Sequence, residues 1–484
     1  MRKYKLLSLL SLSLLTAVAF QVTSCTNDFE DTNTDPNRLQ EISPGTLLNP
    51  LIYEVATSNM YRSWSYNSEL MQDILTFPQT SYGIQHYNLS DNIGSASWNT
   101  YYRWMKTAKD IEAAAVRVKD ANYEAIGITM RVWMAANLVD LFGDVPYFDA
   151  GKGGEGVIYP AFDDQEAIYD SLFADLERAN ELYDSKKGMI YYQDILFNND
   201  IAKWQKFTNS LHLRLLLRIS NKANKEAYPK MVAMLGNPAK YPIITKVEEE
   251  ATLLITGVNP NISPWSRIQD FTLSRKMASF FIDNLNEFKD PRLPVFATQA
   301  TRMENQKKVN IGYKGIPSAF EGSDGQFDYE ASTLNNKMAA NPTKTAILTY
   351  AEVLFIQAEL AQKGYLTGAE DFYKKGVQAA MDFYAVAMPN DYFDNPATAY
   401  DGSLERILLQ KYYALYMNDY QQWFEYKRTG FPKLPKTKTM MNNGVMPSRF
   451  PYPLDIRTKN KTNYEKQIQK MGGDDINIKI WWQN

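Results

Sequence analysis

The sequence has 484 residues and a formal net charge of −3, from 52 basic and 55 acidic residues. This balance excludes the strongly positive surface that binds the phosphate backbone of nucleic acid, so no nucleic-acid partner is expected. One Cys and two His exclude an internal disulfide and the zinc sites that are built from Cys or from several His. Neither a metal nor a cofactor is therefore predicted.

The N-terminus has the pattern of an export signal. Arg2, Lys3 and Lys5 precede an uncharged apolar stretch from residue 6 to residue 20. This stretch is shorter than the roughly 20 apolar residues that a membrane-spanning helix requires. A basic start followed by a short apolar segment is typical of a cleaved secretory signal. Residues 1–24 are accordingly interpreted as a signal peptide.

The end of this signal resembles a bacterial lipobox, with the sequence Val22-Thr23-Ser24-Cys25. At such a site, cleavage occurs before the Cys, which then becomes lipidated. Several acyl chains anchor a protein stably, whereas one chain binds only marginally. We expect lipidation at Cys25, so that the chain contacts the membrane through this anchor only. The alternative is a chance Cys beside an ordinary cleavage site. The polar residues 25–38 would form a flexible tether.

Helical periodicity dominates residues 39–484, which we expect to form a single domain. Apolar residues three and four positions apart predict a helix over residues 123–142, and Gly143 would end it. Another helix is expected to begin at Asn341-Pro342 and to end at Gly364. Thr367 to Glu370 then matches a capping box that would open the next helix. Further helices are expected over residues 95–119, 164–183, 201–221, 275–288 and 403–428.

Short connections between these helices predict antiparallel hairpins. They lie near residues 95–142, 164–221, 341–388 and 403–428, and they resemble four irregular tetratricopeptide (TPR) units. Residues 236–340 are rich in Gly, Pro and Asn and show little sustained periodicity. A loop-rich insertion of this length in a compact domain is usually functional. The predicted fold is therefore mostly α, with the loop-rich insertion forming a ligand face.

Aromatic residues in or beside polar loops are the candidate ligand contacts. The chain contains 32 Tyr, 23 Phe and 9 Trp. Flat rings interleaved with amide and hydroxyl groups are what a sugar-binding or peptide-binding surface requires. The candidates are Tyr82, Tyr87, Trp98, Trp265, Tyr313 and Phe320. For each of them the alternative is a ring that packs against the helices.

Several sequence patterns bear on catalysis. Residues 151–156 match the GxGxxG pattern, but no strand and helix are predicted around them, so we interpret them as a surface loop. His212 lies in an apolar helical run and is expected to be a core residue. A pair of glycosidase carboxylates requires proximity in space and not a fixed spacing in the sequence, so the sequence leaves that alternative open.

Motifs distributed over the whole chain resemble the SusD/RagB family. Any single motif is weak, but their order and spacing carry the resemblance. They are NTDPN at 33–37, NLVDLFGDVP at 137–146, DPRLP at 290–294, YAEVLF at 350–355, EYKRTG at 425–430, RFPYP at 449–453, GGDD at 472–475 and the pair Trp481-Trp482.

The resemblance implies an outer-membrane lipoprotein of Bacteroidota with no enzymatic activity and no catalytic residue. Such proteins have a mostly helical, SusD-like fold with four TPR-like pairs. They capture oligosaccharides or oligopeptides at the cell surface and deliver them to a SusC-like TonB-dependent transporter barrel. Only Cys25 carries over as a functional residue. A lipid-anchored glycoside hydrolase or esterase, and a surface adhesion protein, are the alternatives.

Overall fold

A computed structural model describes residues 43–80, 83–189, 191 and 193–483. Residues 43–484 form one compact unit. The predicted signal peptide, Cys25, the tether and Tyr82 lie outside the described residues.

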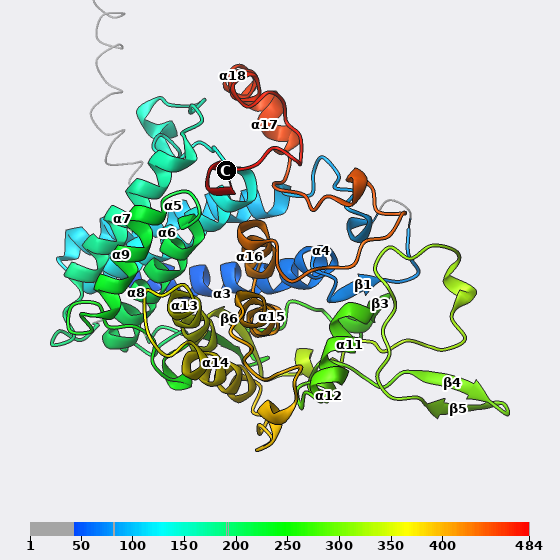
Figure 1. The fold of residues 1–484 in the computed structure, drawn as a ribbon. Coiled ribbons are helices and arrows are strands. Elements are labelled where there is room, and N and C mark those ends of the chain that lie inside the picture. Colours follow the sequence, from blue (N-terminus) through cyan, green and yellow to red (C-terminus); the bar gives the residue numbers. More distant parts are fainter. Residues whose placement is uncertain (1–42, 81–82, 190, 192, 484) are drawn as a thin grey trace, which may run out of the picture. The chain divides into compact units, whose positions relative to one another are not determined.

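The described chain is mostly helical, which confirms the predicted fold class (Figure 1). The helices are α3 (Pro44–Arg62), α4 (Ser68–Leu70), α5 (Ser95–Val118), α6 (Ala121–Phe142), α7 (Gln165–Leu182), α8 (Ile201–Ile219), α9 (Asn224–Leu235), α10 (Ile268–Thr272), α11 (Ser279–Phe288), α12 (Leu293–Phe296), α13 (Tyr350–Gln362), α14 (Ala369–Phe383), α15 (Leu404–Ala414), α16 (Gln421–Thr429), α17 (Leu454–Lys459) and α18 (Lys461–Met471). The strands are β1 (Ile74–Thr76), β2 (Ala251–Ile255), β3 (Arg275–Met277), β4 (Thr301–Glu304), β5 (Lys307–Asn310) and β6 (Thr343–Leu348).

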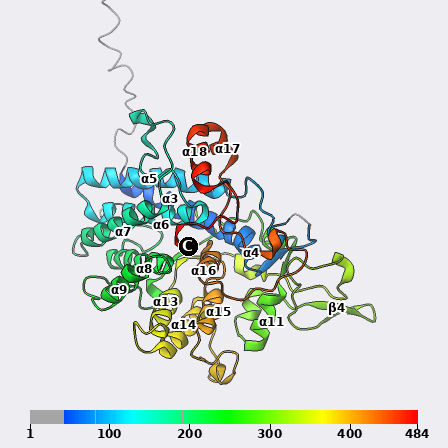
Figure 2. The same cartoon turned by 45° about the horizontal axis from the view of Figure 1, so that its top comes forward.

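The long helices pack as neighbouring pairs, α5 with α6, α7 with α8, and α13 with α14. Figures 1 and 2 show these pairs gathered on one side, while α11 and the β4–β5 hairpin lie on the other. Helix α6 is the centre of the scaffold. The side chain of Asp120 caps its first turn by accepting from the backbone N–H groups of Asn122 and Tyr123, and Gly143, with a φ of 83°, follows its end. By length and composition α6 could span a membrane, but its apolar stretch is entirely buried in this fold.

Four predicted helix boundaries are wrong. Residues 343–348 are strand β6 and not helix, because Thr343, Thr345 and Ile347 turn inward as the strand pairs with β2. Helix α13 therefore begins at Tyr350, where the side chain of Thr349 caps it. Gly368, and not Thr367, is the N-cap of α14.

The other two boundary errors also come from tertiary contacts. Residues 275–277 form β3, which pairs with β1, before α11 begins. The predicted helix over residues 403–428 is divided into α15 and α16 by a turn in which Met417 adopts a φ of 63°. The sequence analysis did not predict α3, α4, α9, α10, α12, α17 or α18.

The strands form three separate antiparallel pairs, β1 with β3, β2 with β6, and β4 with β5. In the pair β2–β6, Leu254 lies opposite Lys344, and Thr252 lies opposite Ala346. Side chains alternate between the two faces of a strand. Leu253 and Ile255 therefore face the core, whereas Leu254 is 47% exposed.

Candidate functional site

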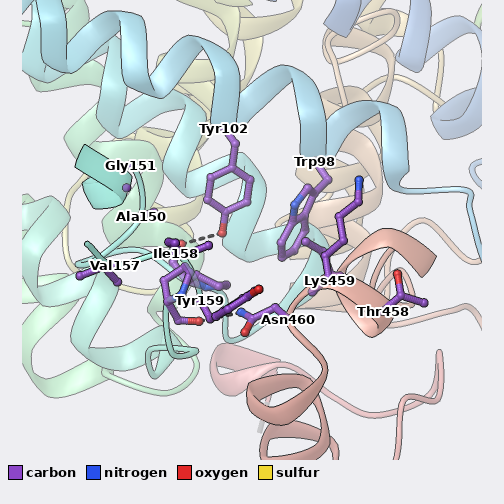
Figure 3. Close-up of a pocket in the computed structure, with 14 residues that line it drawn as sticks. Trp98, Tyr102, Ala150, Gly151, Val157, Ile158, Tyr159, Thr458, Lys459 and Asn460 are labelled. Carbon is purple, nitrogen blue, oxygen red and sulfur yellow. Dashed lines mark hydrogen bonds between the residues drawn. The ribbon is translucent and has the colours of Figure 1, made fainter. Parts of the chain in front are cut away.

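The main candidate site is a cleft of about 760 Å³ between α5, the loop that follows α6, and α17 (Figure 3). Rings, backbone and amide groups contributed by three distant parts of the chain line it. The lining residues are Trp98, Tyr102, Pro146, Ala150, Gly151, Gly153, Val157, Ile158, Tyr159, Pro160, Ile456, Thr458, Lys459 and Asn460. A smaller hollow of about 120 Å³ shares Tyr102, Ala150 and Gly151 with this cleft.

The loop wall takes its shape from two glycines and one carboxylate. Gly151 and Gly156 have φ values of 87° and 90°, in the left-handed region that favours glycine, and they bracket a short turn. Asp163 closes the base of the loop, because its Oδ2 accepts from the backbone N–H groups of Tyr147 at 2.7 Å and Phe148 at 3.0 Å. The GxGxxG match therefore forms a turn in the loop that lines the cleft, and it is not followed by a phosphate-binding helix.

The junction of α17 and α18 holds the far end of the loop. Asn460 Nδ2 donates to the carbonyl oxygen of Pro160 at 2.7 Å, and Asn463 Nδ2 donates to that of Tyr159 at 3.0 Å. Lys470 forms an ion pair with Asp144 at 2.8 Å at the start of the loop. The position of Tyr159 thus depends on side chains about 300 residues away.

Helix α5 supplies the opposite wall. Trp98 and Tyr102, four residues apart, lie on one helix face with ring centroids 4.9 Å apart. Phe142 and Tyr452 pack edge-on against Trp98, so Trp98 is only 4% exposed. Burial raises the pKa of Tyr102 well above its usual value. Its hydroxyl therefore stays protonated and donates to the carbonyl oxygen of Pro146 at 2.6 Å.

The freely available ring in the cleft is Tyr159. It is 65% exposed, and the neighbouring Ile158 is 71% exposed. In Figure 3, Tyr102 and Trp98 project from α5 toward the loop that carries Tyr159, with Asn460 and Lys459 on the α17 side. An exposed ring beside amide, hydroxyl and ammonium groups is suited to stacking on a sugar ring and to hydrogen bonding its hydroxyl groups.

Aromatic, aliphatic, amide and ammonium groups line the cleft. Its described lining contains no Asp, Glu, His, Ser or Cys. Within the ranges that the structure describes, no cluster of three or more His, Cys, Asp or Glu side chains is suited to holding a metal ion. The described His212 is 2% exposed, and burial lowers its pKa to about 4. It is a core histidine, as the sequence analysis predicted.

The structure buries the rings of three predicted ligand contacts away from the cleft. Tyr87 is 2% exposed, and burial raises its pKa to about 12. Trp265 is 5% exposed and lies edge-on to Trp64 and Phe271. Phe320 is 4% exposed and contacts Phe327. None of these three offers a free ring face to a ligand.

The other predicted contacts differ in their surroundings. Trp98 lines the cleft, and none of the other described candidates does. Tyr313 is half-buried, and its backbone carbonyl accepts from Asn286 Nδ2 at 3.0 Å. The segments around Tyr87 and Phe320 do meet, because the backbone N–H of Ala319 donates to Gln85 Oε1 at 3.2 Å.

The predicted ligand contacts did not include Tyr159, Tyr102 or Asn460. One signal for Tyr159 was present: the apolar pair Ile158-Tyr159 lies between a glycine turn and Pro160, where a short polar loop would be expected. No local pattern indicated Asn460, because its contact with the loop is tertiary.

Comparisons with known proteins place the chain in a family. Residues 36–453 match the SusD-like family model described as starch-binding and associating with the outer membrane. Among curated proteins, no relative is matched. A chitin-binding protein of solved structure is 26% identical, with a TM-score of 0.77, and the match covers 91% of this chain and 100% of that chain.

Two SusD homologues of known structure share the fold. The one from Bacteroides fragilis NCTC 9343 is 23% identical over 92% of this chain and 100% of that chain, with a TM-score of 0.76. The one from Bacteroides uniformis ATCC 8492 is 21% identical, with a TM-score of 0.76, and the match covers 91% of this chain and 99% of that chain. Because the family model spans most of the sequence, the chain belongs to the SusD-like family of starch-binding proteins that associate with the outer membrane.

Proposed function

We propose that the chain is a non-enzymatic, cell-surface lipoprotein that captures oligosaccharides and delivers them to a SusC-like TonB-dependent transporter. Membership of a starch-binding family and a fold shared with a chitin-binding protein support the choice of a glycan. The observation that carries the proposal is the cleft, in which the exposed ring of Tyr159 faces a wall of aromatic and amide groups.

The geometry supports a weak, reversible interaction. One exposed ring and a few polar groups bind a sugar chain modestly, which suits a protein that must release its ligand into a transporter. The hollow that shares Tyr102 with the cleft extends the surface along α5, which supports a ligand of more than one sugar unit. A described lining without carboxylates supports capture and not hydrolysis of the glycan.

The lipid anchor at Cys25 completes the proposed function. Tethering the protein and its transporter to the same membrane raises their effective concentration, so a weak contact between them suffices. Replacing Cys25 with Ser is expected to move the protein from the outer-membrane fraction to the soluble fraction. Co-purification with the transporter from detergent-solubilised membranes tests the partner.

The experiment that tests glycan capture is calorimetric titration of Tyr159→Ala with malto-oligosaccharides and chito-oligosaccharides. We expect a loss of affinity of about tenfold, because an aromatic contact contributes on the order of 0.5–1.5 kcal/mol beyond its buried area. The fold should not change, since the side chain is largely exposed.

The matched control is Tyr365→Ala, which removes a tyrosine that is 43% exposed and is not part of the described cleft lining. This variant should bind glycans as the wild type does. Equal affinities for wild type and Tyr159→Ala would show that the cleft is not the site. Binding of oligopeptides but of no oligosaccharide would replace the glycan with a peptide ligand.

A further inference from the structure

A second pocket lies away from the cleft, beside the outward face of the β2–β6 pair, and we call it the β6 pocket. Its volume is about 510 Å³, within the range of roughly 300–1,000 Å³ that is usual for small-molecule sites. Six segments line it, and none of their residues belongs to the cleft. The lining residues are Met60, Leu254, Pro294, Val295, Asn335, Lys337, Met338, Pro342, Thr343, Lys344, Ala346, Phe383, Tyr384, Ala385, Tyr416 and Met417.

Strand alternation explains which side chains form one wall of the pocket. Leu254 lies opposite Lys344, and Ala346 is two residues further along β6, so all three side chains share the outward face. Leu254 is 47% exposed although it lies in a pocket wall. An apolar side chain left open to solvent in a concave site is a surface that a ligand can cover favourably.

The deeper part of the pocket combines methionine and aromatic side chains. Met60, Met417 and Tyr416 are 4%, 7% and 2% exposed. Phe383 and Tyr384 add two rings, with centroids 4.9 Å apart. Methionine adapts its shape to a ligand, and its sulfur makes favourable contacts with aromatic rings. These properties favour a ligand with an aromatic body.

The charged lining residues of the β6 pocket are both basic, Lys337 and Lys344. Both are exposed. Among the described residues, neither has an ion-pair partner. The Lys344 ammonium lies 5.9 Å from the centre of the Phe383 ring. Glu250 interacts with Lys344, but burial raises its pKa to about 8, so this carboxyl is largely protonated at pH 7 and does not neutralise the lysine.

We propose that the β6 pocket binds a small amphipathic carboxylate with an aromatic body. The rings and methionines would cover the apolar body, and the two lysines would pair with the carboxylate. An ammonium group recognises a carboxylate through charge-assisted hydrogen bonds. This site is additional to the proposed glycan cleft and does not depend on it.

The probe for this proposal is 4-phenylbutyrate, compared with 4-phenylbutan-1-ol, which has the same body without the charge. Both are titrated calorimetrically into the mature chain from residue 25 that carries Cys25→Ser. We expect saturable binding of the carboxylate and about tenfold weaker binding of the alcohol. The double variant Lys337→Ala and Lys344→Ala should bind the carboxylate only as weakly as the wild type binds the alcohol.

A second variant tests the pocket itself. Ala346→Trp places a large ring on the outward face of β6 and should abolish the binding of both probes, with melting followed to show that the variant is folded. The double lysine variant tests the proposal even if Ala346→Trp does not fold, because it changes exposed side chains only. Tyr159→Ala should bind 4-phenylbutyrate as the wild type does, which separates this site from the glycan cleft.

Two outcomes would overturn the proposal. No saturable binding of either probe would show that the pocket is not a ligand site for this class. Equal binding of acid and alcohol, unchanged in the lysine variant, would show that the pocket does not recognise a carboxylate.

Discussion

The helical scaffold and the wall of the cleft are held by different kinds of contact. In the scaffold, Arg428 of α16 binds both carboxylate oxygens of Glu359 in α13, at 2.7 and 2.6 Å, and also Glu425 at 2.8 Å. The side chains of Arg428 and Glu359 are at most 1% exposed. In the cleft, the Tyr159 loop is held by the amides of the buried Asn460 and the half-buried Asn463, and by the Lys470 ion pair, in which the lysine is 51% exposed.

The two kinds of contact therefore differ in their effect on the stability of the fold. A buried charge that loses its partner is not solvated by water, so a substitution that breaks a buried ion pair of the scaffold destabilises the whole fold. The loop contacts lie near water, which replaces a lost hydrogen bond at low cost. The cleft can therefore vary in sequence while the scaffold keeps its structure.

The largest expected effect comes from Arg428→Met, which retains much of the side-chain volume but removes the charge. Among the residues that the structure describes, the Glu359 carboxylate would keep only the Lys363 ammonium as an ion-pair partner, at 3.8 Å. Breaking a buried ion pair on one side costs about 3–5 kcal/mol of unfolding free energy. Urea denaturation followed by circular dichroism measures this loss.

The control is Arg302→Met, which breaks the exposed pair of Arg302 with Glu304 at 2.6 Å. An exposed pair contributes only about 0–1 kcal/mol. Similar losses in the two variants would contradict the distinction between the buried scaffold and the exposed surface.

An effect of the opposite sign is expected for Glu250→Gln. Burial raises the pKa of Glu250 from 4.5 to about 8. The folded state therefore holds a proton that the unfolded state releases between these two values, so the contribution of Glu250 to stability is lost as the pH rises from 4.5 through 8. Glutamine has no titrating proton, so the variant does not lose stability in this pH range. Its side-chain oxygen can still accept the hydrogen bond from the backbone N–H of Tyr350.

We expect Glu250→Gln to be equally stable with the wild type at pH 4 and more stable at pH 9. At about 1.4 kcal/mol per unit, the pKa shift from 4.5 to about 8 sets an upper limit of about 5 kcal/mol on the difference at pH 9. Thermal or urea unfolding across this pH range measures the difference. Glu248→Gln, an exposed carboxylate two residues away, should show no such pH dependence. A stability difference that is the same at pH 4 and pH 9 would contradict the assignment.

The sequence predicts the scaffold well where a local signal decides the structure. Helix α6 has a continuous apolar pattern, a capping Asp120 and a terminal Gly143, and its predicted limits hold within two residues. Strand β6 was mistaken for helix because its structure depends on β2, which lies nearly a hundred residues earlier. The alternation of Thr343, Thr345 and Ile347 was the available sign of a strand.

The residues that line the cleft were harder to predict than the fold. Trp265 and Tyr159 are both loop aromatics beside a proline, yet one is buried and the other is 65% exposed. Trp265 is buried by Trp64, about 200 residues away, and Tyr159 is positioned by Asn463, about 300 residues away. Burial of a loop side chain is a tertiary property, so composition alone could not separate the two.

The smallest expected effect tests how the cleft wall is held. Asn463→Ala removes hydrogen bonds to the backbone carbonyls of Tyr159 and Pro160 but leaves the Tyr159 ring intact. Because a hydrogen bond contributes on the order of 1 kcal/mol, glycan affinity should fall about fivefold with little change in stability. Calorimetry measures the affinity, and hydrogen exchange at residues 158–162 should become faster.

Asn477→Ala is the matched control, because Asn477 is an exposed asparagine whose amide pairs with Asn442 outside the described cleft lining. It should change neither the affinity nor the exchange of the loop. If Asn463→Ala lowered the stability as much as Arg428→Met did, the contacts of the cleft wall would contribute to the stability of the fold as the scaffold contacts do, which would contradict the comparison. If only the affinity falls, the ring of Tyr159 binds the glycan and the α17–α18 junction holds that ring in place.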